Sequence, residues 1–179
     1  MLIPIQISDL ELILKWRNNP DTRKNMYTSH EISWEEHKRW FSEQKDDPSR
    51  FYFKCSNEDV DIGVVYFTDY HAERGNAFWG FYSGFEAPAG AGIIMEYDAL
   101  RYAFDTLKLH KLNCEVVSYN KAVINLHKKT GFTEEGVFRD FHYYDGQYHD
   151  VIRLGMLASE WEKVKFRLQK RLKILNKKY

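Results

Sequence analysis

The chain has 179 residues, 16% of them aromatic, and a formal net charge of zero. This length predicts one domain, over residues 1–179, with room for a sizeable core. No run approaches the roughly 20 apolar residues of a membrane span, and the start lacks the basic segment and cleavage site of a signal peptide. We therefore expect a cytoplasmic protein without a membrane span.

The first third is predicted to hold two helices. One covers residues 8–18, with Ser8 as N-cap and Glu11 completing a capping box. Asn19 ends it, because the residue before a proline is pushed out of the α region. Ser33 and Glu36 form a second capping-box pattern, which opens a helix to about residue 44.

The rest of the chain alternates strand-like and helical segments. In chain order we expect a hairpin of 51–56 and 61–70, a strand at 76–83, a loop at 85–92, a helix at 93–107, a strand at 111–118, a helix after Asn120, and a hairpin over 138–157. Asp145-Gly146 is a strong turn signal for the last hairpin. The sum is an α/β (α+β) fold, a mostly antiparallel sheet with flanking helices.

The loop at 85–92 has the features of an anion site. It follows a strand, contains Gly90 and Gly92, and leads into a helix N-terminus. Free backbone N–H groups and the positive end of the helix dipole then point at the loop. Glycines let the backbone approach a pyrophosphate without interference from a Cβ atom.

A second strand-to-helix junction lies further along the chain. The segment NKAVINLHKKTGF runs from Asn120 to Phe132 after a β-rich run, and Gly131 sits where a helix C-terminus favours positive φ. Asn120 and His127 are almost two turns apart, so both project on one side of the helix. Taken alone, this pattern also fits a common capped helix.

Together, the two junctions resemble the GNAT-family N-acetyltransferases over roughly residues 1–157. The resemblance implies a sheet splayed by acetyl-CoA, with no metal, and a cofactor slot between the fourth and fifth strands. The Gly90-Ala91-Gly92 loop would hold the pyrophosphate, although Ala87 occupies a position where the family carries Gln or Arg. Asn120 would lie beside the pantetheine arm.

The resemblance also suggests the chemistry. Backbone N–H groups of Phe81, Tyr82 and Ser83 would hold the acetyl carbonyl. His127 stands where most relatives have a tyrosine general acid, and an imidazole can donate a proton to the leaving sulfur. The alternative for His127 is a partly exposed helix residue beside two lysines. No general base is evident.

The N-terminal third is similar to the aminosugar N-acetyltransferases of the pseudaminic acid pathway, which acetylate the 4-amino group of a UDP-linked dideoxy sugar. By that resemblance, the substrate-binding residues are Arg17, His37, Thr68 and Tyr82. Arg17 can bind a diphosphate bidentately. Trp16, Trp34, Trp40 or Tyr27 would stack on uracil. Asp69 replaces a lysine that is frequent in that family. The alternatives are that Arg17 pairs with an acid such as Glu11 or Asp21 and that the tryptophans are core residues.

The net charge hides a basic C-terminus. Residues 163–179 carry eight Lys or Arg and no acid, within a helical extension expected at 158–179. Such a tail can bind nucleic acid, a membrane surface or an acidic partner. The alternative is a terminal helix docked on the acidic body or across a homodimer. Cys55 and Cys114 lack metal-ligand spacing, so we expect reduced core thiols.

Two other functions remain open from the sequence. Ribosomal-protein and other protein N-terminal acetyltransferases share the early Trp-Arg pair and the Leu-His-Lys-Lys type of helix. A catalytically silent acetyl-CoA-binding module that uses its basic tail to hold a partner is the third reading.

Overall fold

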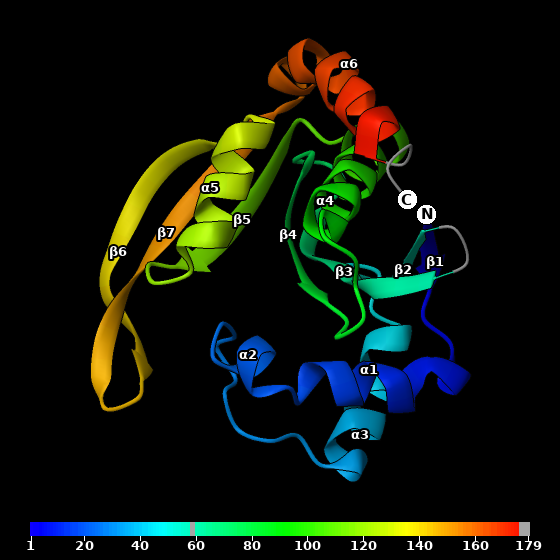
Figure 1. The fold of residues 1–179 in the computed structure, drawn as a ribbon, viewed down its shortest axis with the longest axis vertical. Helices are drawn as coiled ribbons and strands as arrows, with labels where there is room; N and C mark the ends of the chain where they lie inside the picture. Colours follow the sequence, from blue (N-terminus) through cyan, green and yellow to red (C-terminus); the bar gives the residue numbers. More distant parts are fainter. Residues whose placement is uncertain (58–59, 176–179) are drawn as a thin grey trace.

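The computed structural model describes residues 1–57 and 60–175 (Figure 1). Within these residues a seven-stranded sheet has the order β1-β2-β3-β4-β5-β7-β6. The strands are β1 (Leu2–Pro4), β2 (Phe51–Asn57), β3 (Val60–His71), β4 (Asn76–Ser83), β5 (Lys111–Val117), β6 (Thr133–Tyr144) and β7 (Gln147–Leu157). The helices are α1 (Leu10–Arg17), α2 (Pro20–Arg23), α3 (Trp34–Lys45), α4 (Ala91–Arg101), α5 (Lys121–Thr130) and α6 (Ala158–Leu175).

The junction between β4 and β5 is the feature that positions the site. These strands are parallel and pair only over Asn76–Phe78 and Lys111–Asn113, whereas the other adjacent strands are antiparallel. Beyond this short ladder β4 and β5 diverge toward the α2 end of the molecule (Figure 1). The predicted mostly antiparallel sheet, opened between its fourth and fifth strands, is therefore confirmed.

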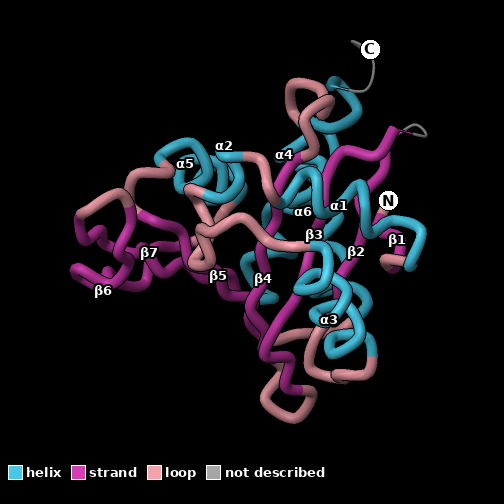
Figure 2. Tube along the Cα trace, turned by 90° about the horizontal axis from the view of Figure 1, so that it is seen from below, coloured by secondary structure: helices cyan, strands magenta, loops and turns pink. Residues whose placement is uncertain are grey.

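The sheet has a core on each face, because successive side chains of a strand point to opposite sides. On one face, α4, α5 and α6 cover a large cluster that includes Val65, Phe67 and Leu112. On the other face, α1 and residues of α3 pack against Val64 and Tyr66. Figure 2 shows α1 and α3 beside β2 and β3, and α2 toward α5.

The predicted elements are confirmed, with two shifts of helix start and one of strand start, since β6 begins at Thr133; β1 and α2 were not predicted. Ser8 is not an N-cap: a 3₁₀ turn covers Ile7–Asp9, the Gln6 N–H donates to Asp9 (2.9 Å), and α1 begins at Leu10. The Asp9 carboxylate reaches back three residues, so it takes the role expected of Glu11. The helix expected at 93–107 begins at Ala91, and its last part, Tyr102–Thr106, is π-helical.

Several turn and cap predictions are confirmed in detail. Ser33 accepts a hydrogen bond from the Glu36 N–H (3.2 Å) at the start of α3, which confirms its N-cap role, whereas the Glu36 carboxylate pairs with His30 (3.1 Å) and does not complete the capping box. Asp145 and Gly146 both have positive φ in the β6–β7 turn, as a two-residue type I′ turn requires. Gly131 has φ 121° where α5 ends.

The basic C-terminal segment forms α6 and docks on the body. Trp161, Leu168 and Leu172 are buried, whereas Phe166 is 73% exposed. Trp161 Nε1 donates to Asp105 (3.1 Å), and Lys165 pairs with the same carboxylate (2.9 Å). This matches the docked terminal helix among the sequence alternatives. Lys177 and Lys178 lie outside the described residues, as does the Leu175 side chain.

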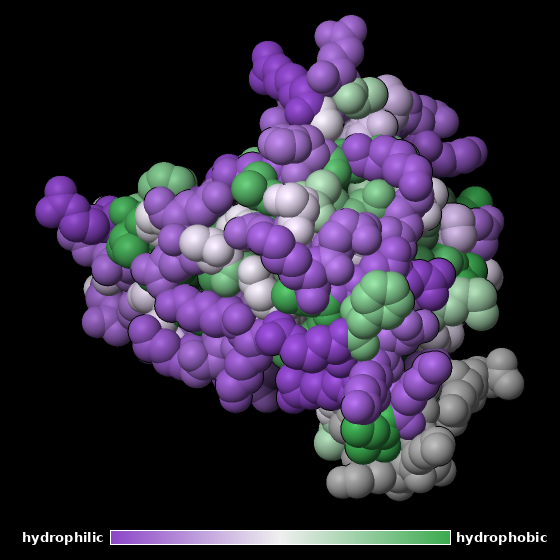
Figure 3. All heavy atoms as spheres, turned by 90° about the horizontal axis from the view of Figure 1, so that it is seen from above, coloured by the Kyte–Doolittle hydropathy of each residue, from purple (hydrophilic) through white to green (hydrophobic). Residues whose placement is uncertain are grey.

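Figure 3 views the molecule from the α6 end, where hydrophilic residues cover most of the face and hydrophobic patches between them are small. Among residues 1–57 and 60–175, no helix is both long and apolar enough to cross a bilayer.

Candidate active site

A hollow of about 360 Å³ opens where β4 and β5 separate. Its walls combine residues of both strands with the N-terminal ends of α2 and α5. The lining residues used below are Asp21, Tyr66, Trp79, Phe81, Tyr82, Ser83, Cys114, Glu115, Asn120 and His127. Five of the predicted site residues thus meet at one place: Phe81, Tyr82, Ser83, Asn120 and His127.

The hollow passes through the sheet rather than lying on one face. Phe81 and Cys114 belong to the side covered by α4, α5 and α6. Tyr66 and Tyr82 belong to the opposite side, under α1. A molecule held between the strands would therefore contact chemically different walls at its two ends, one around His127 and one near Arg17.

The glycine loop beside this opening has the geometry expected of a phosphate cradle. Gly90 is the N-cap of α4 with φ 94°, a left-handed conformation that favours glycine. A Cβ atom added at Gly92 would lie 3.2 Å from Leu126 Cδ2. An eleven-residue helix begins here, and a helix N-terminus favours an anion, although Gly90, Ala91 and Gly92 do not themselves line the hollow. These residues fit the pyrophosphate of acetyl-CoA.

Asn120 is the N-cap of α5. Its side-chain oxygen accepts a hydrogen bond from the Val123 N–H (3.3 Å), which explains why the helix starts at this residue. Because the residue also lines the hollow, it fixes the entry of α5 against the opening.

His127 is not a partly exposed surface residue. It is 2% exposed, and its Nδ1 lies 2.7 Å from Oε1 of Glu96, a fully buried carboxylate of α4. Burial disfavours the imidazolium, but Cys114 and Glu96 outweigh that effect and raise the pKa of His127 to about 10. The ring therefore carries a proton near neutral pH.

Glu96 holds the imidazole in a fixed position. The same Oε1 accepts the Thr130 hydroxyl proton (2.6 Å), so one carboxylate oxygen joins two residues of α5. Trp79 and Phe132 pack on the imidazole at centroid distances of 5.3 and 5.2 Å. The resulting wall places a charged, oriented proton donor beside the hollow.

Arg17 lies on the other side of the sheet, beside the tyrosines that line the hollow. Its Nη2 donates to the Thr28 carbonyl (2.8 Å), and its Nη1 is buried without a hydrogen-bond partner. Within the described part of the chain no carboxylate pairs with it, so neither Glu11 nor Asp21 is its partner. Burial lowers the pKa of Arg17, partly opposed by Tyr82 and Tyr66, and a guanidinium still stays charged.

The two tyrosines near Arg17 are partly buried donors. Burial raises the pKa of Tyr66 to about 12 and raises that of Tyr82 further. Both hydroxyls therefore keep their protons at any ordinary pH. Together with Arg17 they form a wall of hydrogen-bond donors.

The acids of the hollow are already engaged. Asp21 pairs with Lys24 (2.5 Å). Glu115 binds Arg153 (2.6 Å) and accepts the Tyr27 hydroxyl proton (2.6 Å). The wall near Arg17 therefore has a hydrogen-bond donor without a partner, Nη1, but its acids are already paired, so it suits an anion better than a cation.

Of the four predicted substrate residues only Tyr82 lines the hollow; Arg17, His37 and Thr68 do not. His37 is 2% exposed, stacks on Trp40 at 5.1 Å, and has a buried Nε2 without a partner. Burial lowers its pKa, so it is neutral near pH 7. Thr68 of β3 pairs in register with Phe78 of β4. It lies two residues beyond Tyr66, so both side chains point to the same face of the sheet.

The tryptophans divide between core and surface. Trp16 is 5% exposed and part of the α1 core, so it is not available to stack on a base. Trp40 packs edge-on to Tyr52 at 4.9 Å. Trp34 is 36% exposed. Tyr27 is half exposed and held by Glu115.

Sequence reasoning missed Glu96, Cys114 and Tyr66. A signal for Glu96 was present, because Ile93, Glu96 and Leu100 share one helical face and an acid in an apolar stripe is rarely buried without a partner. For Cys114 and Tyr66 the sequence shows only strand residues, and their place at the opening depends on where β4 and β5 part.

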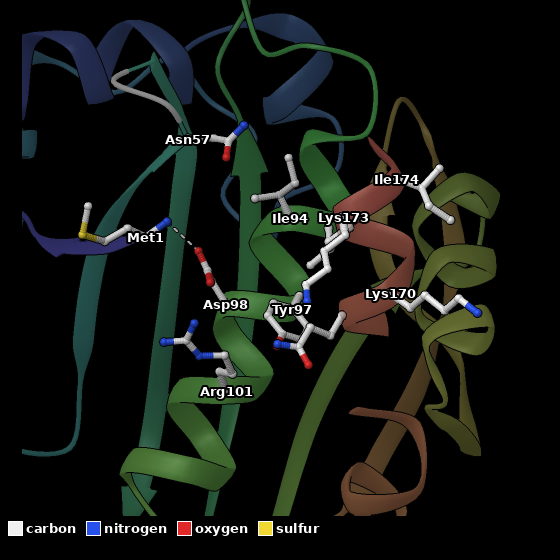
Figure 4. Close-up of a pocket in the computed structure, with 11 residues that line it drawn as sticks. Met1, Asn57, Ile94, Tyr97, Asp98, Arg101, Lys170, Lys173 and Ile174 are labelled. Carbon is white, nitrogen blue, oxygen red and sulfur yellow. Dashed lines mark ion pairs between the residues drawn. The ribbon is translucent and has the colours of Figure 1, made fainter. Parts of the chain in front are cut away.

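A second hollow lies between α4, α6 and the start of the chain (Figure 4). Its volume of about 550 Å³ is larger, but its walls are formed by other residues, including Arg101, Lys170 and Lys173. The Met1 ammonium group pairs there with Asp98 (2.6 Å). None of the predicted site residues lines it. In the described ranges, no cluster of three or more His, Cys, Asp or Glu could hold a metal ion.

Residues 1–133 match the family model described as Acetyltransferase (GNAT) domain. The chain belongs to the GNAT acetyltransferase family. It is thus an acetyl-CoA-dependent N-acetyltransferase, and this membership sets aside the catalytically silent module.

The similar proteins include Acetyltransferase PseH of Campylobacter jejuni (serotype O:23/36), 31% identical over 135 residues that cover 75% of this chain and 83% of PseH. The [Ribosomal protein uS5]-alanine N-acetyltransferase of Escherichia coli is 28% identical over 117 residues, which cover 63% of this chain and 60% of that enzyme. Spermidine N-acetyltransferase of Vibrio cholerae, solved with CoA and spermine, superposes with a TM-score of 0.84 at 24% identity, covering 90% and 96%. The acetyltransferase therefore shares its fold with enzymes of several amine substrates.

Proposed function

We propose that this acetyltransferase acetylates the 4-amino group of a UDP-linked dideoxy aminosugar, as in pseudaminic (nonulosonic) acid biosynthesis. The amine would enter from the face under α1, and the thioester would lie in the opening between β4 and β5.

The observation that carries the proposal is the unpaired Arg17 guanidinium beside Tyr66 and Tyr82. A buried guanidinium N–H without an acceptor, such as that of Nη1, is costly, and a diphosphate supplies acceptors bidentately. A polycation such as spermidine would meet this positive charge, while the nearby acids Asp21 and Glu115 are already paired.

The chemistry follows from the two walls of the hollow. Acetyl-CoA supplies the thioester. Backbone N–H groups near Phe81, Tyr82 and Ser83 would stabilise the developing oxyanion, and protonated His127 would protonate the departing sulfur. The sugar amine, with an ordinary pKa near ~8, is neutral often enough to react without a dedicated base.

The similarity to Acetyltransferase PseH accords with the resemblance of residues 12–41 to the aminosugar enzymes. A protein N-terminus is the second candidate, because a uS5-alanine N-acetyltransferase is also a relative. The two differ in the charge they need: a diphosphate needs Arg17, whereas a peptide amine does not.

The test is kcat/KM for the UDP-linked 4-amino sugar, the same sugar without UDP, an N-terminal alanine peptide, and spermidine. The proposal expects the UDP-linked sugar to be far the best substrate, since remote contacts orient the amine. Equal rates with and without UDP, or a better rate with peptide, would contradict it.

Arg17→Ala should raise KM for the UDP-linked sugar while the affinity for acetyl-CoA stays nearly constant. Arg17→Lys should also be impaired, because a point charge cannot replace a planar fork. The matched control is Arg39→Ala, which removes an exposed cation from α3.

A further inference from the structure

Three exposed aromatic side chains form a continuous surface between the β6–β7 hairpin and the loop after α2. Tyr27, Phe138 and Phe141 are 54%, 40% and 59% exposed. The centroid of the Phe141 ring lies 6.1 Å from that of Tyr27 and 5.5 Å from that of Phe138. We call these three rings the aromatic platform. Large apolar side chains that are grouped on a surface mark a binding site more often than scattered ones do.

A bulge in β6 brings the two phenylalanines together. Residues three apart in a regular strand point to opposite faces of the sheet, so Phe138 and Phe141 would otherwise not meet. The register with β7 shifts between Phe138 and His142, and Asp140 has φ 51°. The Asp140 N–H donates to the Asp150 carboxylate (3.0 Å), which holds the bulge in place. Bulges beside functional sites re-aim side chains in this way.

The platform is connected to the side of the hollow near Arg17. The Tyr27 hydroxyl donates to Glu115 (2.6 Å), which lines the hollow. On its other side the Tyr27 ring packs edge-on to His142, with 5.7 Å between centroids. The carbonyl of the next residue, Thr28, accepts the hydrogen bond from Arg17 Nη2 (2.8 Å). The ring of Tyr27 is therefore fixed, and it lies next in the chain to the group that the guanidinium binds.

The register of the sheet places Phe138 on the same side. Phe138 pairs with Val151 of β7, and Val151 pairs with Val117 of β5. Glu115 precedes Val117 by two residues, so its side chain points to the same face of the sheet. Phe138 thus lies on the face where Tyr27 and Glu115 meet.

We propose that the aromatic platform stacks on the base of the nucleotide part of the substrate, while Arg17 binds the diphosphate. The inference rests on the proposed function, because the platform needs a substrate that carries a base. A pyrimidine has two flat faces and a polar rim, so it can lie on exposed rings while its rim stays in water. Stacking of this kind tolerates exposure, and the loss of one ring weakens base binding by roughly 5- to 150-fold.

The neighbouring cation favours this occupant over a second copy of the chain. Arg17 Nη1 has no hydrogen-bond partner among the described residues. A base joined to a diphosphate uses both the rings and this donor, whereas a contact between two copies uses the rings alone. The two occupants therefore predict different results when Phe141 is replaced.

The same hairpin provides a matched control. Tyr143 and Tyr148 are 59% and 64% exposed, pair in register across the two strands, and pack on each other with 5.0 Å between ring centroids. In the described part of the chain neither ring packs against a ring of the platform. Tyr143→Ala therefore removes an exposed aromatic ring of β6 and leaves the platform intact.

The experiment measures the binding of UDP and of inorganic pyrophosphate to the full chain by calorimetry. We expect Phe141→Ala to weaken UDP binding by roughly 5- to 150-fold and to leave pyrophosphate binding nearly unchanged. Phe141→Tyr keeps a ring and should bind UDP as the wild type does, as should Tyr143→Ala. Arg17→Ala should weaken the binding of both ligands.

The outcomes separate the platform from the proposed function. Wild-type UDP affinity in Phe141→Ala would overturn the platform, and the proposed function would stand if the UDP-linked sugar remained the best substrate and Arg17→Ala stayed impaired. Failure of the wild type to bind UDP would overturn both. Sedimentation of Phe141→Ala adds a further check: loss of a dimer with unchanged UDP affinity would assign the rings to a contact between copies instead.

Discussion

Glu96 of α4 and His127 of α5 form a buried ion pair, with 2.7 Å between Oε1 and Nδ1. The pair joins the helix that follows the glycine loop to the helix that follows Asn120. It therefore connects the two halves of the cofactor site that the sequence suggested, through residues on facing sides of two helices.

The stability of the fold should depend on this pair in a defined pH direction. Because the folded-state pKa of His127 is raised to about 10, its contribution is fully present below its unfolded pKa near ~6.5. That contribution is lost as pH rises through about 10. His127→Ala should cost about 3–5 kcal/mol near pH 6, since it leaves Glu96 buried and unpaired. In urea unfolding, the difference in unfolding free energy between His127→Ala and the wild type should become smaller above pH 10. A difference that grows with pH would contradict the ion pair.

Turnover of His127→Ala should fall by ~10²–10⁴-fold, the usual loss for a proton-transfer residue. The dissociation constant for acetyl-CoA should change much less. Single-turnover rates and calorimetric binding separate the two quantities. Unchanged turnover would leave His127 with a structural role alone.

Glu96→Gln should move the alkaline limb of the kcat–pH profile to lower pH. The carboxylate is one of the groups that raise the pKa of His127, so its neutral replacement lets the imidazole lose its proton sooner. Glu134→Gln is the control, because this carboxylate pairs with Lys128 at the surface. Identical limbs in Glu96→Gln and wild type would rule out a protonated His127 in the rate-limiting step.

Gly90→Val should abolish the rise in melting temperature that acetyl-CoA produces. At 100 times its dissociation constant, a native-state ligand stabilises by about 2.7 kcal/mol. Gly90 has φ 94°, so a β-branched residue distorts the start of α4. Gly136→Ala is the comparison, because a Cβ there meets nothing within 4 Å. A full shift in Gly90→Val would exclude the loop from cofactor binding.

Leu168→Ala should destabilise the fold by about 2–5 kcal/mol, because this α6 side chain is 1% exposed. Phe166→Ala removes a larger but exposed side chain of the same helix and should stay within about 0.5 kcal/mol. Equal effects in urea unfolding would mean that α6 does not dock as described.

Much of the architecture was predictable because it depends on local signals. The Ser33 cap, the Asp145-Gly146 turn and the Asn120 N-cap each act through residues a few positions apart. The start of α1 was missed because the sequence allows two capping boxes, Ser8 with Glu11 and Gln6 with Asp9. The structure uses the second, in which the Gln6 N–H donates to Asp9 and Leu10 is buried.

The site was predictable only in part, for a physical reason. His127 was identified from its helix position, but its partner Glu96 is 31 residues away, and no local spacing relates the two. The raised pKa of His127 depends on that distant carboxylate, because burial alone would lower it. His37 and Trp16 show the reverse case, since their residue types suggested ligand contacts while packing between helices accounts for their burial.

The short ladder between β4 and β5 has a consequence for how the molecule is held together. Only three residue pairs of the β4–β5 ladder join the β1–β4 half of the sheet to the β5–β7 half. Past them, the facing edges of β4 and β5 do not pair with each other, so their backbone groups are available to a bound ligand. A pantetheine arm with its two amide groups would extend the ladder where the polypeptide leaves it unfinished. While it is bound, acetyl-CoA would then act as part of the sheet by bridging β4 and β5. Each release of CoA would leave the two halves of the sheet joined by the short ladder alone.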